Sequence, residues 1–315
     1  MGFSELLGNA RLKENLENSI NKGRISHFYL ISGPVGSGKH TLARLLVAAI
    51  LCGSENKPCL SCSACRKVMG NSHPDFITVE DPEHKTVPVR IVRQVREDMF
   101  IRPNEAQRKI YLFPQELGEE GQNALLKILE EPPSYGVYIL LTDNSEKLLP
   151  TVRSRCTELK LLSLPEVELQ QELTKRFPKA ETAAIRGAIT RSGGYLGQAI
   201  ALLEDGGAVI PQTQAFVDSF TGKDAYGLIQ VLVPMEKWKR DRILPVFTEW
   251  LQLLQSALAC RSGMPAVSPL AQKMAESRSS ADLLAAVKHL QKSIEYTQAN
   301  VSVGTICGYL EWALR

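Results

Sequence analysis

Residues 33–41, Gly-Pro-Val-Gly-Ser-Gly-Lys-His-Thr, combine three glycines with a lysine. Glycines let consecutive backbone N–H groups turn inward around an anion, and a lysine adds a full positive charge. The segment follows a strand-like apolar run, 28–31, and opens an apolar helix, 42–51, whose N-terminus adds a partial positive charge. This context predicts a phosphate-binding loop (P-loop). The candidate nucleotide-binding residues are Gly33, Gly36, Ser37, Gly38, Lys39, His40, Thr41 and, from a later strand, Thr142.

The loop departs from the pattern for ATP hydrolysis at one position. The pattern G-x-x-x-x-G-K-[ST] supplies a hydroxyl that holds magnesium, and this chain has His40 there. Thr41 does not substitute directly, because the next residue on a helix is turned by about 100°. The sequence therefore leaves ATP or ADP as a candidate ligand and puts magnesium binding in doubt. A glycine-rich turn without a ligand is the alternative.

Four cysteines, Cys52, Cys59, Cys62 and Cys65, have the spacing of a metal site. Cysteines separated by two residues place two thiolates on one cation, and Cys52, at the end of the predicted helix 42–51, would complete a tetrahedral set. Zn²⁺ is the natural ion, and with four protein ligands its role would be structural. An iron–sulfur cluster would need another cysteine soon after Cys65, and none follows nearby. Free thiols are the alternative.

The composition excludes some classes of function. The 315 residues include 37 Lys and Arg against 34 Asp and Glu, a net charge of +3, which gives no argument for nucleic-acid binding from bulk charge. The chain has no run of about 18 apolar residues, and its first residues lack the pattern of a signal peptide. We therefore expect a cytoplasmic protein, in which cysteines are thiols or metal ligands rather than disulfides.

Strand-like runs alternate with helical stretches in the first half of the chain. This alternation predicts a parallel sheet covered by helices on both faces. Strands are expected at 28–31, 76–79, 110–113, 137–142 and 158–161, and helices at 4–22, 42–51, 89–100 and 119–131. On the helix 89–100, Arg90, Arg93 and Arg96 most simply form a solvated face, and a contact with phosphate or a partner is the alternative.

Beyond residue 165 the strand signal stops. Helices are expected at 165–177, 180–192, 197–203, 225–233, 238–259, 280–292 and 303–314. Glycines and a proline predict a linker at 204–211. We therefore predict three parts, 1–162 with the cysteine module 52–65 inserted, 163–207 and 208–315.

The strand expected at 110–113 is followed by Pro114-Gln115-Glu116. ATP hydrolysis would need an aspartate here to hold magnesium and a glutamate to polarise the attacking water. Neither acid stands in register, and Glu116 comes too late to be assigned the role. The sequence thus predicts a phosphate-binding loop without the acids that hydrolysis requires.

Residues 123–133, Asn-Ala-Leu-Leu-Lys-Ile-Leu-Glu-Glu-Pro-Pro, followed by Ser154-Arg155-Cys156, resemble the bacterial clamp-loader branch of the AAA+ ATPases. The cysteine quartet before His73-Pro74-Asp75 resembles the zinc module of this branch. The resemblance covers about the first 205 residues. It implies an α/β P-loop NTPase (AAA+) domain with a parallel sheet, a small helical lid at 163–207, and an all-α collar domain at 208–315 that joins an oligomeric ring.

The resemblance also implies partners and a place in DNA replication. The partners would be gamma/tau motor subunits and a delta subunit in a hetero-oligomeric ring, and the ring would bring the chain to the sliding clamp and primer-template DNA, away from any membrane. The chain would belong to a replicative polymerase assembly by membership and carry no polymerase chemistry of its own.

The clamp-loader branch contains motor subunits that hydrolyse ATP and a stator that usually hydrolyses nothing. Three departures favour the stator: His40, Pro114-Gln115, and Gly197 where a motor subunit carries a lid arginine. The loss of one such group can cost about 10³ in rate. We therefore expect negligible ATP hydrolysis by the chain alone.

In this branch the arginine of Ser-Arg-Cys reaches into the neighbouring subunit's nucleotide site. The resemblance assigns that arginine finger, acting in trans, to Arg155, and such fingers contribute roughly 10³ to 10⁵ in rate. Arg153 is a second candidate, expected to pair with an acidic neighbour. Two other functions stay open: an active ATPase of the gamma/tau type that uses Lys39, Thr41 and Glu116 in shifted positions, and a zinc- and nucleotide-binding adaptor outside replication.

Overall fold

The computed structural model describes residues 2–204, 211–264, 268–299 and 301–314. The chain forms two compact units. The first comprises Met1–Arg176 with Gly193–Ala199, and the second comprises Phe177–Ser192 with Ile200–Arg315. The first unit contains the P-loop and the cysteine quartet.

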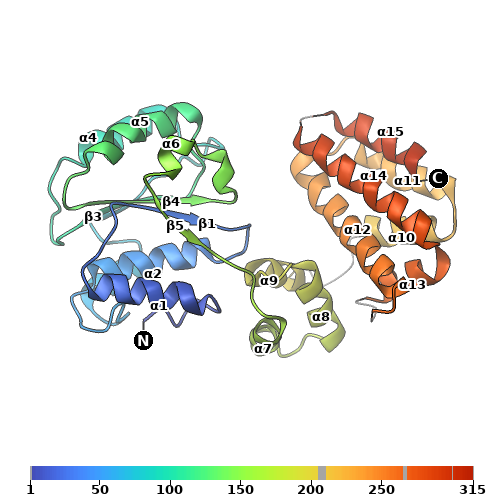
Figure 1. Cartoon of the computed structure of the whole chain (residues 1–315), viewed down its shortest axis with the longest axis horizontal. Coiled ribbons are helices and arrows are strands. Elements are labelled where there is room, and N and C mark those ends of the chain that lie inside the picture. The colour runs from blue at the N-terminus through green and yellow to red at the C-terminus, as the bar shows by residue number, and fades with distance from the viewer. Residues whose placement is uncertain (1, 205–210, 265–267, 300, 315) are drawn as a thin grey trace. The chain divides into compact units, whose positions relative to one another are not determined.

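A five-stranded parallel sheet forms the centre of the first unit (Figure 1). Its strands lie in the order β2-β3-β4-β1-β5. Ser32 pairs with Thr142, so the carboxyl ends of β1 and β4 lie side by side. The segments that follow these two strands, which include the P-loop, therefore emerge at the same edge of the sheet. The strands are β1 (Phe28–Ser32), β2 (Phe76–Thr78), β3 (Lys109–Phe113), β4 (Gly136–Thr142) and β5 (Thr157–Lys160).

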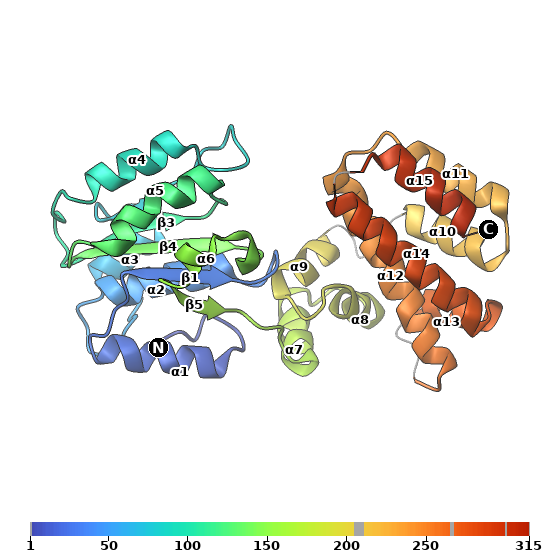
Figure 2. The ribbon, with the colours of Figure 1, turned by 45° about the horizontal axis from the view of Figure 1, so that its top comes forward.

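Helices cover both faces of this sheet, as predicted (Figures 1 and 2). One face packs against α1 (Ala10–Asn21), α2 (Lys39–Leu51) and α3 (Ser63–Met69). The other packs against α4 (Val89–Asp98), α5 (Glu119–Glu130) and α6 (Pro150–Arg153). Successive strand residues alternate between the two cores: Ile31 and Ile139 lie in the first, and Leu30 and Tyr138 in the second. Burial on both faces explains why these strands are almost continuously apolar.

The N-terminal helix is shorter than predicted, because α1 begins at Ala10 rather than near Ser4. Gly8 and Asn9 have φ values of 57° and 50°, which no α-helix accommodates. A Cβ atom on Gly8 would lie 2.3 Å from Leu164 Cδ2, so the turn brings the chain close to the segment after β5. In the first unit, the short helices α3 and α6 were not predicted, and a 3₁₀ turn, η1 (Ser145–Lys147), follows β4.

The helices expected to form the lid are divided between the two units. α7 (Glu166–Arg176) and the first turn of α9 (Leu196–Glu204) belong to the first unit, whereas α8 (Thr182–Arg191) belongs to the second. The domain boundary after residue 162 stays a prediction. The boundary after 207 and most of the predicted linker lie outside the described residues.

The second unit is a helical bundle around Trp250, whose ring stacks on Phe216 with a 4.1 Å centroid separation. Its helices are α8, the rest of α9, α10 (Pro211–Thr221), α11 (Ala225–Met235), α12 (Arg240–Arg261), α13 (Pro269–Ser277), α14 (Ser280–Gln298) and α15 (Val303–Ala313). Buried Glu249 pairs with Arg191 of α8 at 2.9 Å and accepts a hydrogen bond from Thr213. This network joins α8 to the bundle.

One described helix segment, Arg242–Arg261, is long and apolar enough to cross a membrane by length and composition alone. Phe247, Trp250 and Leu254 of this segment are completely buried in the core of the second unit. Its apolar character is therefore accounted for by packing within the bundle.

Candidate functional site

The P-loop lies between the end of β1 and the start of α2, as predicted, but its lysine is already bonded within the chain. Lys39 Nζ donates to the carbonyl oxygens of Gly33 at 2.6 Å and Pro34 at 2.9 Å, and it forms an ion pair with Asp143 Oδ1 at 2.6 Å. These three bonds use all three protons of the ammonium group. Only 8% of the Lys39 side chain is exposed, so the charge is held inside the loop.

The first turn of α9 lies directly on the P-loop. The Gly197 N–H donates to the Gly36 carbonyl at 2.9 Å, and Gln198 Nε2 donates to the Val35 carbonyl at 2.9 Å. Gly36 has a φ of 76°, and a Cβ atom there would lie 2.5 Å from the backbone nitrogen of Gln198. Glycine is thus required at position 36 both by the backbone conformation and by the close approach of α9.

The loop retains part of an anion cradle. Ser37 Oγ is buried and has no hydrogen-bond partner in the described structure, and the first N–H groups of α2 stand beside it at the positive end of the helix. An unsatisfied buried hydroxyl next to a helix N-terminus fits a phosphate oxygen. The fit is incomplete, because the ammonium group of Lys39 is bonded elsewhere.

Three further residues were predicted to bind nucleotide: His40, Thr41 and Thr142. His40 and Thr41 are largely exposed in the first turn of α2. Partial burial of the imidazole, together with nearby Lys39, lowers the pKa of His40. The Thr142 hydroxyl donates to the Asn144 carbonyl at 2.9 Å and accepts from the Asn144 N–H at 3.1 Å. It is therefore engaged by its own loop.

Gln115 stands at the end of β3 and holds a neighbouring loop. Its Oε1 accepts from the Asp81 N–H at 2.8 Å, and its Nε2 donates to the carbonyls of Asp81 and His84 at 2.9 and 3.2 Å. Glu116 instead pairs with Lys147 at 2.8 Å. Both residues that follow Pro114 thus make contacts that do not depend on a bound nucleotide.

The four predicted metal ligands come together. The sulfur atoms of Cys52, Cys59, Cys62 and Cys65 all lie within 4.8 Å of one another, with Cys52 to Cys62 and Cys59 to Cys65 at 4.0 Å. Tetrahedral zinc with bonds of about 2.3 Å places its sulfur ligands about 3.8 Å apart, so the donor set fits this ion. Cys52 follows the end of α2, as predicted, and α3 begins within the module.

Backbone groups favour thiolates in this module. The Cys62 N–H donates to Cys59 Sγ at 3.3 Å, and the Cys65 N–H donates to Cys62 Sγ at 3.4 Å. Hydrogen bonds from Ser54 and from nearby backbone lower the pKa of Cys59 to about 5. Burial acts in the opposite direction on Cys65 and raises its pKa. A cation would offset the cost of ionising this buried thiol.

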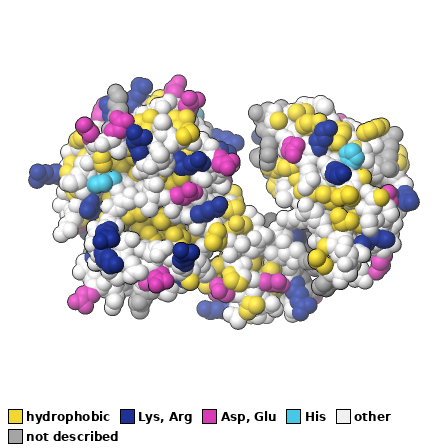
Figure 3. Space-filling model, viewed as in Figure 1, with side chains coloured by type: hydrophobic (Ala, Val, Ile, Leu, Met, Phe, Trp, Pro, Cys, Tyr) yellow, Lys and Arg dark blue, Asp and Glu magenta, His cyan; other side chains and the backbone are white. Residues whose placement is uncertain are grey.

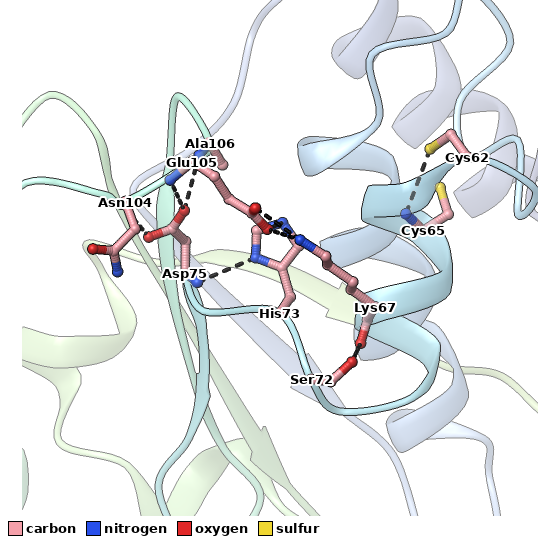
Figure 4. Close-up of polar contacts among 9 residues, drawn as sticks. All are labelled: Cys62, Cys65, Lys67, Ser72, His73, Asp75, Asn104, Glu105 and Ala106. Atoms are coloured by element: carbon pink, nitrogen blue, oxygen red, sulfur yellow. Dashed lines mark hydrogen bonds and ion pairs between the residues drawn. The ribbon is translucent and has the colours of Figure 1, made fainter.

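A polar network connects α3 to the loop before β3 (Figure 4). Lys67 of α3 pairs with Glu105 at 2.7 Å, and Glu105 lies 3.6 Å from buried His73. The Asp75 carboxylate accepts the N–H groups of residues 104, 105 and 106 at 2.5 to 2.9 Å. His73 and Asp75, which the sequence offered only as a landmark, thus fix the loop that leads into β3.

Replacing Asp75 with asparagine should lower the free energy of unfolding by about 2–4 kcal/mol at pH 7, because an amide cannot accept all three N–H groups. Burial opposes ionisation of Asp75, but the three donors outweigh it and hold its pKa below the usual value. The stabilisation is therefore complete above the unfolded pKa of about 3.9 and is lost as pH falls through the folded pKa. Urea denaturation from pH 7 to pH 3 tests this, with exposed Glu97→Gln as the control; equal stability of wild type and Asp75→Asn at pH 7 would contradict it.

Arg155 lies two residues beyond α6, and 41% of its side chain is exposed. Its Nη1 donates to the Thr151 carbonyl at 3.0 Å, and its Nη2 lies 3.8 Å from Glu130 at the end of α5. The two sequence segments that carried the resemblance, 123–133 and 154–156, therefore meet at this guanidinium. Buried Gln122 accepts from the Leu149 N–H at 2.7 Å and so fixes the start of α6.

The prediction for Arg153 was wrong. Arg153 is exposed at the end of α6 and forms no ion pair with any described residue, whereas Arg155 pairs with Glu130. On α4, Arg90 and Arg93 are exposed and Arg96 is half-buried. Basic and acidic side chains are interspersed on the face in view in Figure 3, which agrees with the balanced composition.

The sequence did not predict the contacts that Asp143, Gln198 and Glu130 make in these sites. Asp143 directly follows Thr142, and its pairing with Lys39 depends on β4 lying beside β1. Gln198 acts through a segment about 160 residues away from the P-loop. The adjacent glutamates before Pro132 were the one available signal for Glu130, since they end a helix next to the arginine segment.

The fold and these sites describe a P-loop α/β domain with an altered phosphate site, a four-cysteine module and an exposed arginine. Residues 8–165 match the family described as "DNA polymerase III, delta subunit". The chain therefore belongs to the DNA polymerase III clamp-loader family.

Individual relatives carry related names. DNA polymerase III subunit gamma of Buchnera aphidicola subsp. Schizaphis graminum is 32% identical over 210 residues, which cover 64% of this chain and 57% of that protein. DNA polymerase III subunit tau of Salmonella typhimurium is 29% identical over 292 residues, 85% of this chain and 45% of that protein. This chain thus spans about half the length of these relatives. A solved DNA polymerase III gamma subunit-related protein from Thermotoga maritima has 16% identity and a TM-score of 0.43, over 96% of this chain and 99% of that chain.

Proposed function

We propose that the chain is the delta-prime subunit, or stator, of a DNA polymerase III clamp loader, and that it takes part in ATP-dependent loading of the sliding clamp without hydrolysing ATP. The observation that carries this proposal is Gln115. At the position where hydrolysis needs acidic groups, a neutral amide is bonded to the 81–84 loop. A neutral amide has neither the negative charge that binds magnesium strongly nor a basic group that could take a proton from water.

The P-loop would take ATP or ADP as a structural ligand, held by the N–H groups at the start of α2 and by Ser37 Oγ. A bound nucleotide would supply phosphates for this cradle. His40 stands where the magnesium-binding hydroxyl is expected, and its side chain has no hydroxyl. The role of this chain's residues would be to bind and orient the phosphates, with no group placed to move a proton.

Arg155 would act on the nucleotide of a neighbouring motor subunit. Its exposure and its anchoring by Thr151 and Glu130 support this role, because a finger must be both accessible and held in place. The cysteine module would hold Zn²⁺ as a structural ion that stiffens the segment between α2 and β2. All four sulfur atoms would be ligands, which leaves no open position for chemistry at the metal.

The proposed partners are gamma/tau and delta subunits in a cytoplasmic ring, and through the ring the sliding clamp and primer-template DNA. Residues 163–207 would serve as a lid and 208–315 as a collar. The ion pair between Arg191 and buried Glu249 supports a firm connection between α8 and the collar helices.

Reconstitution with purified gamma/tau and delta subunits tests the proposal. We expect the isolated chain to show no ATP hydrolysis above background, and clamp loading by the ring to require the chain. ATP hydrolysis by the isolated chain that Lys39→Ala abolishes would instead identify a motor subunit. Failure to assemble with the other subunits would identify an adaptor outside replication.

A further inference from the structure

Lys39 and Asp143 form an ion pair at the ammonium group that a nucleotide phosphate would otherwise contact. We propose that Asp143 occupies the ammonium group of Lys39 as a carboxylate latch, and that this latch, rather than the loss of catalytic groups, sets the affinity of the P-loop for nucleotide. The inference concerns the same P-loop as the proposed function, but it is independent of whether hydrolysis occurs.

Strand order places the two residues together. β1 and β4 are adjacent and in register, with Ser32 opposite Thr142, so the residues that follow each strand leave the sheet at one edge. The P-loop turns back at this edge and begins α2 with Lys39, while Asp143 directly follows β4. An ion pair of 2.6 Å results between segments 104 residues apart. A mobile anion and the Asp143 carboxylate would thus compete for the same ammonium group.

The bonding of Lys39 shows why an incoming phosphate must displace Asp143. An ammonium group has three protons, and here two are donated to loop carbonyls and one to the carboxylate. The side chain of Lys39 is 8% exposed, whereas that of Asp143 is 50% exposed. The carboxylate is therefore the partner that can swing into water at low cost, while the carbonyls are fixed parts of the loop. Its negative charge would also repel any phosphate that approached with the pair intact.

A second contact keeps the loop in the latched conformation. Gly197 and Gln198 of α9 bond to the carbonyls of Gly36 and Val35, so the carbonyls of residues 33–36 all accept hydrogen bonds from within the chain. Rearrangement of the loop around a ligand would require α9 to move as well. Ser37 Oγ, two residues before Lys39, is buried and has no hydrogen-bond partner in the described structure. This hydroxyl is therefore the part of the cradle that remains unsatisfied while Asp143 is paired with Lys39.

The variant Asp143→Asn separates the charge of the latch from its shape, because asparagine is nearly isosteric and neutral. A matched control is Asp218→Asn, since Asp218 forms a Lys–Asp pair of the same length, 2.6 Å with Lys273, in the second unit. The double variant Lys39→Ala, Asp143→Asn tests whether any gain in nucleotide affinity depends on the ammonium group of Lys39.

The experiment is a titration of each full-length chain with a fluorescent ADP analogue, followed by fluorescence anisotropy. We expect Asp143→Asn to lower the dissociation constant at least tenfold, Asp218→Asn to leave it unchanged, and the double variant to lose the gain. Unchanged or weaker binding by Asp143→Asn would overturn the latch. If this variant fails to give the wild-type circular dichroism spectrum, Asp143→Ser is measured under the same criteria.

The same samples separate this inference from the proposed function. Tighter binding of the ADP analogue by Asp143→Asn, with no ATP hydrolysis by the wild-type chain, supports both proposals. Tighter binding by this variant together with ATP hydrolysis by the wild-type chain retains the latch and overturns the non-hydrolysing stator. Unchanged binding by the variant, with no hydrolysis by the wild-type chain, overturns the latch alone.

Discussion

Replacement of Arg155 by alanine is expected to slow ATP hydrolysis at the neighbouring subunit's site by about 10³ to 10⁵-fold while the ring still assembles. The guanidinium is permanently charged and planar, and it would stabilise negative charge that develops on the transferred phosphoryl group. The side chain is anchored by the Thr151 carbonyl and Glu130 yet 41% exposed, so its removal should leave the fold of this chain intact.

The effect of Arg155→Ala on ATP hydrolysis must be measured at a single nucleotide site. Rings in which the other nucleotide sites have been inactivated would report only the site that Arg155 serves. Arg153→Ala is the matched control, because Arg153 is an exposed arginine of the same segment without an ion pair to any described residue. Equal rates for the two variants would contradict the role assigned to Arg155. Arg155→Lys should recover only a small part of the rate, since lysine lacks the planar donor fork.

Replacement of Cys62 by serine is expected to abolish binding of the proposed zinc ion and to lower the free energy of unfolding by on the order of 4 kcal/mol. Cys62 contributes one of the four clustered sulfur atoms, so its loss leaves the ion with three protein ligands. The serine Oγ can still cap α3 by accepting the Cys65 N–H, so the expected loss comes from the metal. Cys65 and Val68 of α3 are completely buried in the core that includes α2, so loss of the ion would weaken the core of the first unit.

Metal analysis of the purified full-length chain and urea denaturation check this result. Wild type should carry one zinc per chain and Cys62→Ser almost none. Cys260→Ser is the control, because Cys260 is a half-buried cysteine of the second unit, outside the quartet. A wild-type chain without zinc, or a Cys62→Ser chain of unchanged stability, would show that the quartet is a set of free thiols.

Most of the α/β fold could be predicted because its signals are local. Strands buried on both faces, such as β4, are continuous apolar runs, and a glycine-rich turn between a strand and a helix identifies the P-loop. Helix ends could be predicted only where a glycine, a proline or a capping residue marks the end in the sequence. α13 was missed although Ser268 caps it and Pro269 occupies its first turn, a pair of signals that predicts a helix start.

The parts of the site that sequence reasoning missed all depend on contacts between distant segments. The cysteine quartet was predicted because its ligands lie close in sequence, and it is present. Asp143 could not be assigned to Lys39 without the strand order, and α9 could not be placed on the P-loop without the fold of the first unit. Spacing identifies residues that can do chemistry, and only the fold shows which of them already have partners.

The contact between Gly36 and Gly197 limits which residue position 197 can carry. A Cβ atom on Gly197 would lie 2.7 Å from Gly36 Cα, so no side chain fits at position 197 while α9 rests on the loop. Introducing an arginine there would force the helix away from the loop before the new charge could act. For the non-hydrolysing stator that we propose, a substitution at position 197 alone would therefore cost stability without adding activity.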